Sequence, residues 1–108
     1  MTDFQHLSPE QARPMIEQEQ AVVVDIRDQV SFEAGHIQGA QPLTNDNLPE
    51  FLQNTAKDKP VIVCCYHGNS SQQAAQFLSQ QEFTQVFSLY GGFEYWKGFA
   101  PELCQHKS

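Results

Sequence analysis

The sequence predicts an α/β fold with a mostly parallel central sheet and helices on both faces. Three short apolar runs, at residues 21–27, 61–64 and 86–89, have the character of strands, and the first two, rich in valine, that of strands buried on both faces. Segments with helical spacing of apolar side chains separate these runs, and such alternation favours parallel strands joined by right-handed crossovers. We expect one domain over residues 1–108, with a polar tail from about residue 101.

The first helix has a clear start. Ser8 has the residue type of an N-cap, Pro9 suits the first helical position, and Gln11 completes a capping box. Pro14 lies inside this helix and removes one backbone hydrogen bond, which predicts a kink or a short first turn. After the strand at 21–27, residues 28–34 predict a short helix that ends at Gly35.

The remaining elements follow at short intervals. A brief strand is expected near 40–43, and Asp46 or Asn47 is expected to cap a helix through residues 48–52. After the strand at 61–64, apolar residues at helical spacing predict a helix from Ser70 to about residue 80. A turn at Gly91 and Gly92 then separates the strand at 86–89 from a short aromatic helix at 93–99.

The charge of the chain limits its partners. Thirteen Asp and Glu against six Lys and Arg give a net charge of −7, and the basic residues are scattered, so we expect no nucleic-acid binding. Any anion site must therefore be built locally. No apolar run approaches the roughly 20 residues of a membrane span, and the first residues lack the pattern of a secretory signal. We expect no membrane association and a cytoplasmic location.

The three cysteines do not form a recognisable framework. An odd number of cysteines in a chain without a signal argues against structural disulfides. No Cys-x-x-Cys pair occurs, and Cys64, Cys65 and His67 are too crowded for a structural zinc site. We therefore expect no metal.

The loop after the second strand is the candidate site. In open α/β sheets ligands bind where strands end and helices begin, and residues 65–71 occupy that place. Gly68 and Asn69 readily adopt the left-handed backbone of an amide cradle, and Ser70 or Ser71 can supply hydroxyls and cap the following helix. Such a loop binds a small anion or stabilises the thiolate of Cys65.

The two adjacent cysteines are expected to differ. Cys64 is still in the strand and is expected to pack as a small hydrophobe, whereas Cys65 is the first residue beyond it and the better nucleophile. Tyr66 is expected to shape the rim of the site. His67 is expected to be a solvated imidazole, with an acid–base role as the alternative.

Three motifs now identify a family. Val24–Asp28 with Phe32–Ala40 (VDIRD and FEAGHIQGA), Cys65–Ser71 (CYHGNSS) and Leu89–Trp96 (LYGGFEYW) follow one another along nearly the whole chain. In type, order and spacing they resemble the signatures of the single-domain rhodaneses, most closely the small bacterial thiosulfate sulfurtransferases. The resemblance implies a single rhodanese domain.

The resemblance also implies a persulfide cycle. The Cys65 thiolate would take the outer sulfur of thiosulfate, release sulfite, and pass the sulfur to cyanide or to a dithiol protein such as thioredoxin. The loop from Tyr66 through His67, Gly68, Asn69 and Ser70 to Ser71 would bind substrate through amides and hydroxyls, with no cofactor. The commonest rhodanese loop carries arginines where this chain has Tyr66 and Ser70, which predicts weak thiosulfate binding.

Three polar residues earlier in the chain are expected to support the site. Asp25 and Arg27 end a buried strand, so they should be paired or lie at its mouth. The family reading gives them a structural role, with direct substrate contact as the alternative, and His36 is also expected to be structural. Cys104, in the polar tail, is expected to be an incidental exposed thiol, with a resolving thiol as the alternative.

Two other functions compete with sulfur transfer from thiosulfate. One is a persulfide carrier or binding module that receives sulfur from a partner protein. The other is a phosphatase of the same fold, in which an arginine of the loop would bind phosphate. No arginine or lysine lies between Cys65 and Ser71, so the sequence disfavours the phosphatase.

Overall fold

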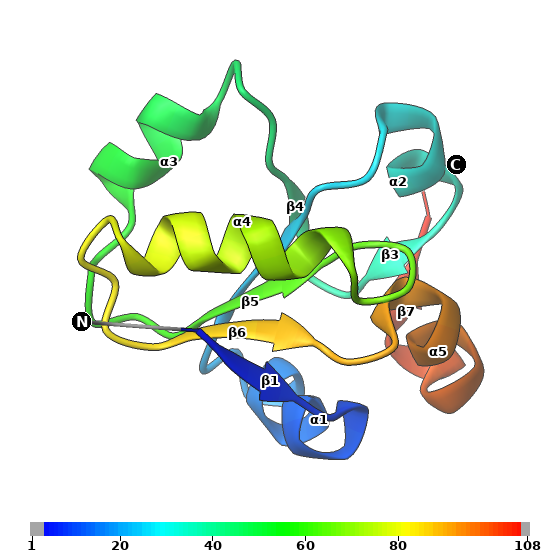
Figure 1. Ribbon diagram of the computed structural model, residues 1–108. Helices are drawn as coiled ribbons and strands as arrows, with labels where there is room; N and C mark the ends of the chain where they lie inside the picture. Colours follow the sequence, from blue (N-terminus) through cyan, green and yellow to red (C-terminus); the bar gives the residue numbers. More distant parts are fainter. Residues whose placement is uncertain (1–3, 107–108) are drawn as a thin grey trace.

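The computed structural model describes residues 4–106, which form a five-stranded parallel sheet with helices on both sides (Figure 1). The strand order is β1-β6-β5-β2-β4, so β5 lies at the centre. The strands are β1 (Gln5–Leu7), β2 (Val22–Asp25), β4 (Gln41–Pro42), β5 (Val61–Cys64) and β6 (Val86–Leu89). The predicted fold class is confirmed.

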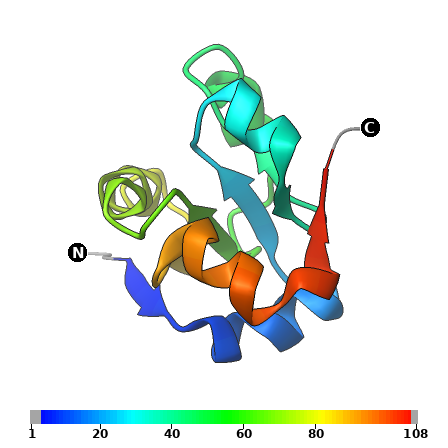
Figure 2. The ribbon, with the colours of Figure 1, turned by 90° about the vertical axis from the view of Figure 1, so that its right-hand side faces the viewer.

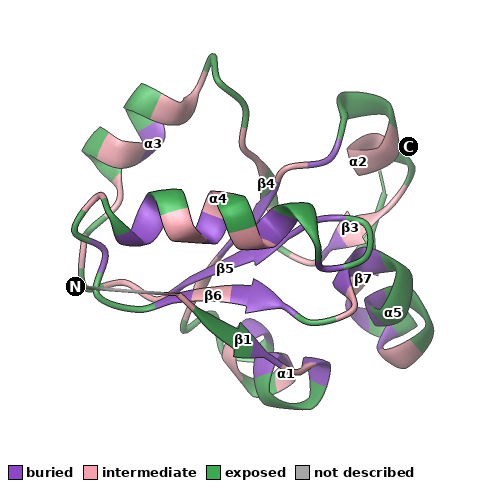
Figure 3. Ribbon diagram, viewed as in Figure 1, coloured by how far each residue is buried: buried purple, intermediate pink, exposed green. Residues whose placement is uncertain are grey.

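Strand alternation divides the core into two apolar clusters. Ile62 and Cys64 of β5 face the cluster that contains residues of α1 (Pro9–Glu17) and α5 (Gly92–Phe99). Val61 and Val63 face the cluster that contains residues of α3 (Leu48–Asn54) and α4 (Ser70–Ser79). All four residues of β5 are buried (Figure 3), as the uninterrupted apolar run predicts.

The start of α1 agrees with the sequence in detail. The Ser8 hydroxyl accepts a hydrogen bond from the Gln11 amide at 3.1 Å, and the Gln11 side chain accepts one from the Ser8 amide at 3.2 Å. The helix continues through Pro14 to Glu17, so the proline does not end it. The sequence did not predict β1, a three-residue edge strand whose only buried residue is Leu7.

Three predicted boundaries are wrong by a few residues. The strand expected over 21–27 is only Val22–Asp25, because Ile26 and Arg27 already turn toward α2 (Gln29–Ala34). The strand expected over 40–43 is the two-residue β4, and α5 begins at Gly92 rather than at residue 93. Asn47 is the N-cap of α3, but its side chain bonds the Thr44 amide and the Pro42 carbonyl instead of capping the helix.

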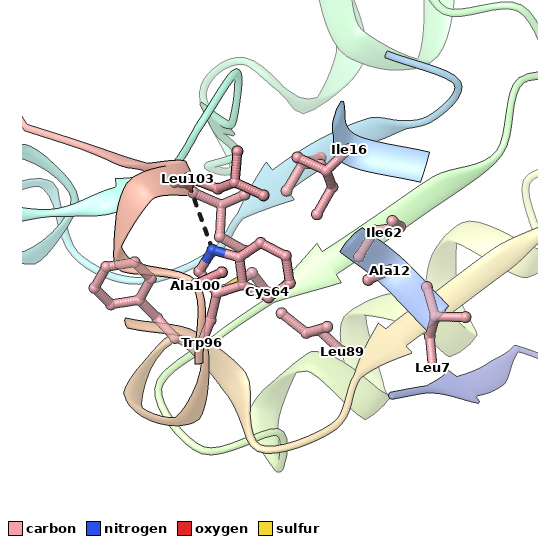
Figure 4. Close-up of a cluster of buried hydrophobic side chains, with 12 residues drawn as sticks. Leu7, Ala12, Ile16, Ile62, Cys64, Leu89, Trp96, Ala100 and Leu103 are labelled. Atoms are coloured by element: carbon pink, nitrogen blue, oxygen red, sulfur yellow. Dashed lines mark hydrogen bonds between the residues drawn. The ribbon is translucent and has the colours of Figure 1, made fainter. Parts of the chain in front are cut away.

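Residues 101–105 of the expected polar tail have regular structure. These residues form a 3-10 helix, η1 (Pro101–Leu103), and a short strand, β7 (Cys104–Gln105), antiparallel to β3 (His36–Ile37). The buried Leu103 accepts a hydrogen bond through its carbonyl from the Trp96 indole at 3.4 Å (Figure 4). Cys104 is half-buried rather than exposed. The sequence did not reveal this closing segment, since among residues 101–105 only Leu103 is buried and Cys104 packs partly against the core.

The carboxyl ends of the parallel strands meet at one edge of the sheet, where the sequence predicts the ligand site. Figure 2 views the molecule from this side, where α2, α5 and the start of α4 surround the strand ends. Within residues 4–106, no helix is both long and apolar enough to cross a bilayer.

Candidate active site

The candidate site lies in the loop between β5 and α4. Cys65 is the first residue after β5, and α4 begins five residues later at Ser70. β5 pairs with β2 so that Asp25 lies opposite Cys64. The loop is therefore at the carboxyl edge of the central strand, as the sequence predicts for a ligand site in an open α/β sheet.

Backbone amides of the loop point at the sulfur of Cys65. The Gly68 amide lies 3.1 Å and the Ser71 amide 3.3 Å from Sγ. Cys65 is 3% exposed, yet it belongs to neither of the two apolar clusters. The sulfur thus lies at the base of a polar cradle rather than in the core.

The cradle favours the thiolate form of Cys65. Burial by itself raises the pKa of this thiol, but hydrogen bonds from the Ser71 hydroxyl and from the amides of Ser71, Gly68 and His67 outweigh burial. The net effect is a pKa below the ordinary cysteine value. A lowered pKa increases the fraction of nucleophilic thiolate at neutral pH.

Cys64 has the opposite environment. Its side chain points into the apolar cluster around Trp96 and Leu89, where it is fully buried (Figure 4). Burial, with the negative charge of Asp25 nearby, raises its pKa well above the ordinary value. The structure thus places Cys64 as the packed residue that strand alternation predicts.

Glycines and helix α5 set the shape of the loop. Gly68 has φ +89°, as predicted, but Asn69 has φ −95° and is right-handed, so the prediction for Asn69 is wrong. The Phe93 amide donates to the Cys65 carbonyl at 2.8 Å, and the Glu94 amide donates to the Tyr66 carbonyl at 3.0 Å. These two bonds hold both carbonyls against the N-terminus of α5, while the Gly68 and Ser71 amides face the sulfur.

The predicted roles of the loop side chains are only partly realised. The Ser71 hydroxyl is buried and lies 2.7 Å from the hydroxyl of Ser88 on β6. Neither Ser70 nor Ser71 is the N-cap of α4, because Asn69 occupies that position without a side-chain cap. Ser70, Asn69 and His67 are exposed at the outer surface of the loop.

Tyr66 joins the loop to α2, a connection that the sequence did not predict. Its hydroxyl donates to the carboxylate of Asp28, the N-cap of α2, and lies 2.6 Å from the Ser31 hydroxyl. The Tyr66 hydrogen bond, followed by those from Ser31, lowers the pKa of Asp28 to about 2. The sequence predicted a helix over 28–34 but neither the N-cap role of Asp28 nor its partner 38 residues away.

Asp25 and Arg27 form a buried pair beside the loop. The Arg27 guanidinium donates to both oxygens of Asp25 at 2.8 to 3.1 Å and also to the Gly35 carbonyl. The face of the guanidinium lies 4.4 Å from the centre of the Phe93 ring. The Arg27 guanidinium is therefore paired within the protein, as expected for charged residues that end a buried strand.

His36 is the first residue of β3, and its contacts are with Phe32. Its Nδ1 is 2.7 Å from the Phe32 carbonyl, and its ring stacks on the Phe32 ring at 4.0 Å. Among residues 4–106, no group of three or more His, Cys, Asp or Glu side chains is arranged to hold a metal ion.

Relatives with assigned activities share the length of the chain. A thiosulfate sulfurtransferase GlpE from Stutzerimonas stutzeri is 50% identical over 106 residues, which is 98% of this chain and 96% of the relative. The GlpE of Pseudomonas fluorescens strain SBW25 is 52% identical over 101 residues, covering 94% and 92% of the two chains.

Solved structures share the fold at lower identity. The rhodanese-like domain of an Anabaena protein superimposes with a TM-score of 0.81 at 21% identity, over 94% of this chain and 78% of that chain. A yeast protein tyrosine phosphatase of the rhodanese family gives 0.74 at 17% identity, over 100% and 96% of the two chains. At these identities the likeness concerns the fold alone. The family model of the rhodanese-like domain matches residues 8–99, and the chain belongs to this family.

Proposed function

We propose that this chain is a thiosulfate sulfurtransferase whose nucleophile is Cys65. The observation that carries the proposal is the pair of amides, at 3.1 and 3.3 Å, that point at a thiol with a lowered pKa. The names of relatives that are 50% and 52% identical over nearly the whole chain support the same activity.

The first half-reaction loads the enzyme. The Cys65 thiolate attacks the outer sulfur of thiosulfate, a new sulfur–sulfur bond forms, and sulfite leaves with the electron pair of the broken bond. The product is a Cys65 persulfide, whose outer sulfur carries the negative charge. The amides that hold the thiolate are placed to stabilise this charge and the departing anion, as an oxyanion hole does.

The second half-reaction unloads the sulfur. An acceptor nucleophile attacks the outer sulfur, and the electron pair of the sulfur–sulfur bond returns to Cys65, which leaves as thiolate. Cyanide would give thiocyanate in this step, and a dithiol protein such as thioredoxin is the acceptor that the family suggests. A leaving group with a low pKa departs faster, so the cradle assists this step too.

Weak binding of thiosulfate follows from the charges around the loop. Between Cys65 and Ser71 there is no cationic side chain, and the nearby Arg27 is paired with Asp25. The dianion would be held by amides and hydroxyls without a guanidinium fork. A steady-state titration that saturates at low micromolar thiosulfate would contradict this prediction.

Intact-protein mass spectrometry tests the proposal. After incubation with thiosulfate the protein should gain about 32 Da, one sulfur atom, and dithiothreitol should remove the gain. Cys65→Ser should abolish the adduct. Cys64→Ser and Cys104→Ser are the matched controls, since Cys64 is packed in the core and Cys104 lies beside Ala100 near the C-terminus.

Each outcome separates the competing functions. If Cys64→Ser alone abolished the adduct, Cys64 rather than Cys65 would be the nucleophile, and the assignment would be wrong. No adduct from thiosulfate, but sulfur uptake from a persulfide donor protein, would favour a carrier. Hydrolysis of an aryl phosphate without an adduct would favour a phosphatase.

A further inference from the structure

A second concave site lies beside the sulfur loop, between α3 and α4. It is a cleft of about 580 Å³, and α3 and α4, which flank it, lie on the same side of the sheet (Figure 1). Its apolar wall consists of Ile26, Leu43, Leu48, Ala74, Phe77 and Leu78. Clefts of about 300–1,000 Å³ that are mainly apolar with a few polar groups are typical small-molecule sites.

The cleft is next to the candidate active site. Ile26 and Arg27 line the cleft, and the Ile26 amide donates to the carbonyl of Cys64, the residue before the nucleophile. The Arg27 guanidinium also lies 5.6 Å from the ring centre of Tyr66, the residue after the nucleophile. Along α4, the lining residue Gln73 lies one turn after Ser70, where the sulfur loop ends.

The lining shows which kind of molecule fits. Among the described residues that line the cleft, only Arg27 is charged, and Asp25 neutralises it at 2.8 Å. Phe77, one of the residues that line the cleft, is 41% exposed, so an apolar ligand there would cover its ring. The cleft therefore favours an uncharged apolar body.

Neither thiosulfate, the proposed donor, nor cyanide, the simplest acceptor, needs such a cleft. Thiosulfate is a small dianion and cyanide is smaller still, so both would fit within the amide loop. Building on the proposed function, we propose that the cleft binds the carbon body of the sulfur acceptor, an organic thiol with an uncharged aliphatic or aromatic chain. The thiol then reaches the Cys65 persulfide past Ile26 and Arg27, the lining residues whose contacts extend to Cys64 and Tyr66.

Sulfur passes to the acceptor by attack of a thiolate on the persulfide. The acceptor thiolate attacks the outer sulfur of the persulfide and forms a new sulfur–sulfur bond. The bond to Cys65 breaks, its electron pair stays on Sγ, and the Gly68 and Ser71 amides receive the thiolate. The products are an organic persulfide and the free enzyme, and no oxidant or reductant is needed.

Two thiols of different length test the inference. With thiosulfate as donor, 2-mercaptoethanol and 6-mercapto-1-hexanol offer primary thiols of similar reactivity that differ by four methylene groups. We expect the KM of the longer thiol to be lower by at least about tenfold, because burial of each methylene group adds to binding.

Two variants locate the effect in the cleft. Phe77→Ser removes exposed apolar wall, and Ala74→Met fills the space, so each should reduce the KM ratio of the two thiols several-fold toward one. Val30→Ser is the matched control, because Val30 is an apolar residue of α2, 76% exposed, that does not line the cleft. Val30→Ser should leave the ratio unchanged.

The outcomes separate this inference from the proposed function. If thiosulfate gives no persulfide on the wild-type protein, the proposed function fails. If the persulfide forms but the two thiols have equal KM values, or Val30→Ser changes their ratio as much as Phe77→Ser, the cleft inference is wrong. It is also overturned if Phe77→Ser impairs transfer to reduced thioredoxin but not to 6-mercapto-1-hexanol, because the cleft would then dock a protein.

Discussion

At the scale of single residues, the neighbouring cysteines Cys64 and Cys65 have thiol pKa values that are shifted in opposite directions. Cys64 ends β5 and points into the Trp96 cluster, where burial raises its pKa. Cys65 is the first residue of the loop beyond β5, where the Ser71 hydroxyl and loop amides lower its pKa against the effect of burial. Hydrogen-bond donors aimed at a sulfur, rather than a nearby cation, make the difference.

The Tyr66 hydroxyl offers a test of the loop connection to α2. Tyr66→Phe removes the hydrogen bond that contributes most to lowering the pKa of Asp28, so this pKa should rise from about 2 toward 3.8. Carboxyl carbon chemical shifts followed through an acid titration would measure the change. Tyr90→Phe is the control, since this tyrosine is 64% exposed and Asp28 should not respond to it.

The same variant should change how stability depends on pH. Because the folded pKa of Asp28 is depressed, its ionised form stabilises the fold above the ordinary pKa of 3.8, and this contribution is lost as pH falls toward 2. Tyr66→Phe should therefore lower the free energy of unfolding at neutral pH, and the gap from wild type should narrow below about pH 4. A gap that is constant from pH 7 to 3 would contradict this account.

At the scale of elements, the N-terminus of α5 holds the sulfur loop in place. Its first amides bind the carbonyls of Cys65 and Tyr66, which requires the two backbones to approach closely. Gly92 makes this approach possible: a Cβ there would lie 2.4 Å from the Tyr66 carbonyl oxygen and 2.6 Å from that of Cys65. Gly92 also has φ +60°, which disfavours any other residue.

Two glycines of the same helix therefore give opposite predictions. Gly92→Ala should cost at least about 2 kcal/mol in the free energy of unfolding, through backbone strain and the clash with the loop. Gly98→Ala should stabilise the protein by about 0.5–1 kcal/mol, because a Cβ at Gly98 meets nothing within 4 Å and alanine favours the helix. Urea denaturation measures both changes.

The rate of persulfide formation should also distinguish the two glycine variants. Gly92→Ala should also slow the formation of the persulfide, whereas Gly98→Ala should not affect it. Equal stability of the two variants would mean that the loop does not depend on its contact with α5.

At the scale of the whole molecule, the net charge of −7 opposes the dianionic donor. The lowered pKa values of Asp28 and Glu94 keep both carboxylates ionised near the loop. Long-range repulsion of this kind is screened over about 10 Å at 0.1 M salt. The protein thus depends on short-range amide contacts to bind thiosulfate.

Salt should consequently improve the binding of the donor. Raising KCl from about 0.02 to about 0.3 M should lower the KM for thiosulfate, because screening weakens the repulsion between like charges. The KM of the neutral thiol 2-mercaptoethanol should not change and is the control. A KM for thiosulfate that rises steadily with salt would indicate a local cation that attracts the donor.

The sequence by itself determined the parallel α/β class, the central strand and the position of the sulfur loop. These features follow from local signals: the valine-rich run of β5, the capping box at Ser8 and the Cys65–Ser71 motif, which are contiguous in the chain. The end of the apolar run also separated the two cysteines, because Cys64 still belongs to the buried strand and Cys65 is the first residue of the loop.

The tertiary structure alone decided which distant residues complete the site. The bond from Tyr66 to Asp28, the seating of the loop on Gly92, and the cleft between α3 and α4 join segments far apart in the sequence. The edge strand β1 and the closing segment of η1 and β7 were missed for the same reason, since each has one buried residue and depends on its partner. Local patterns report the burial of an element, whereas contacts between elements depend on how the whole chain packs.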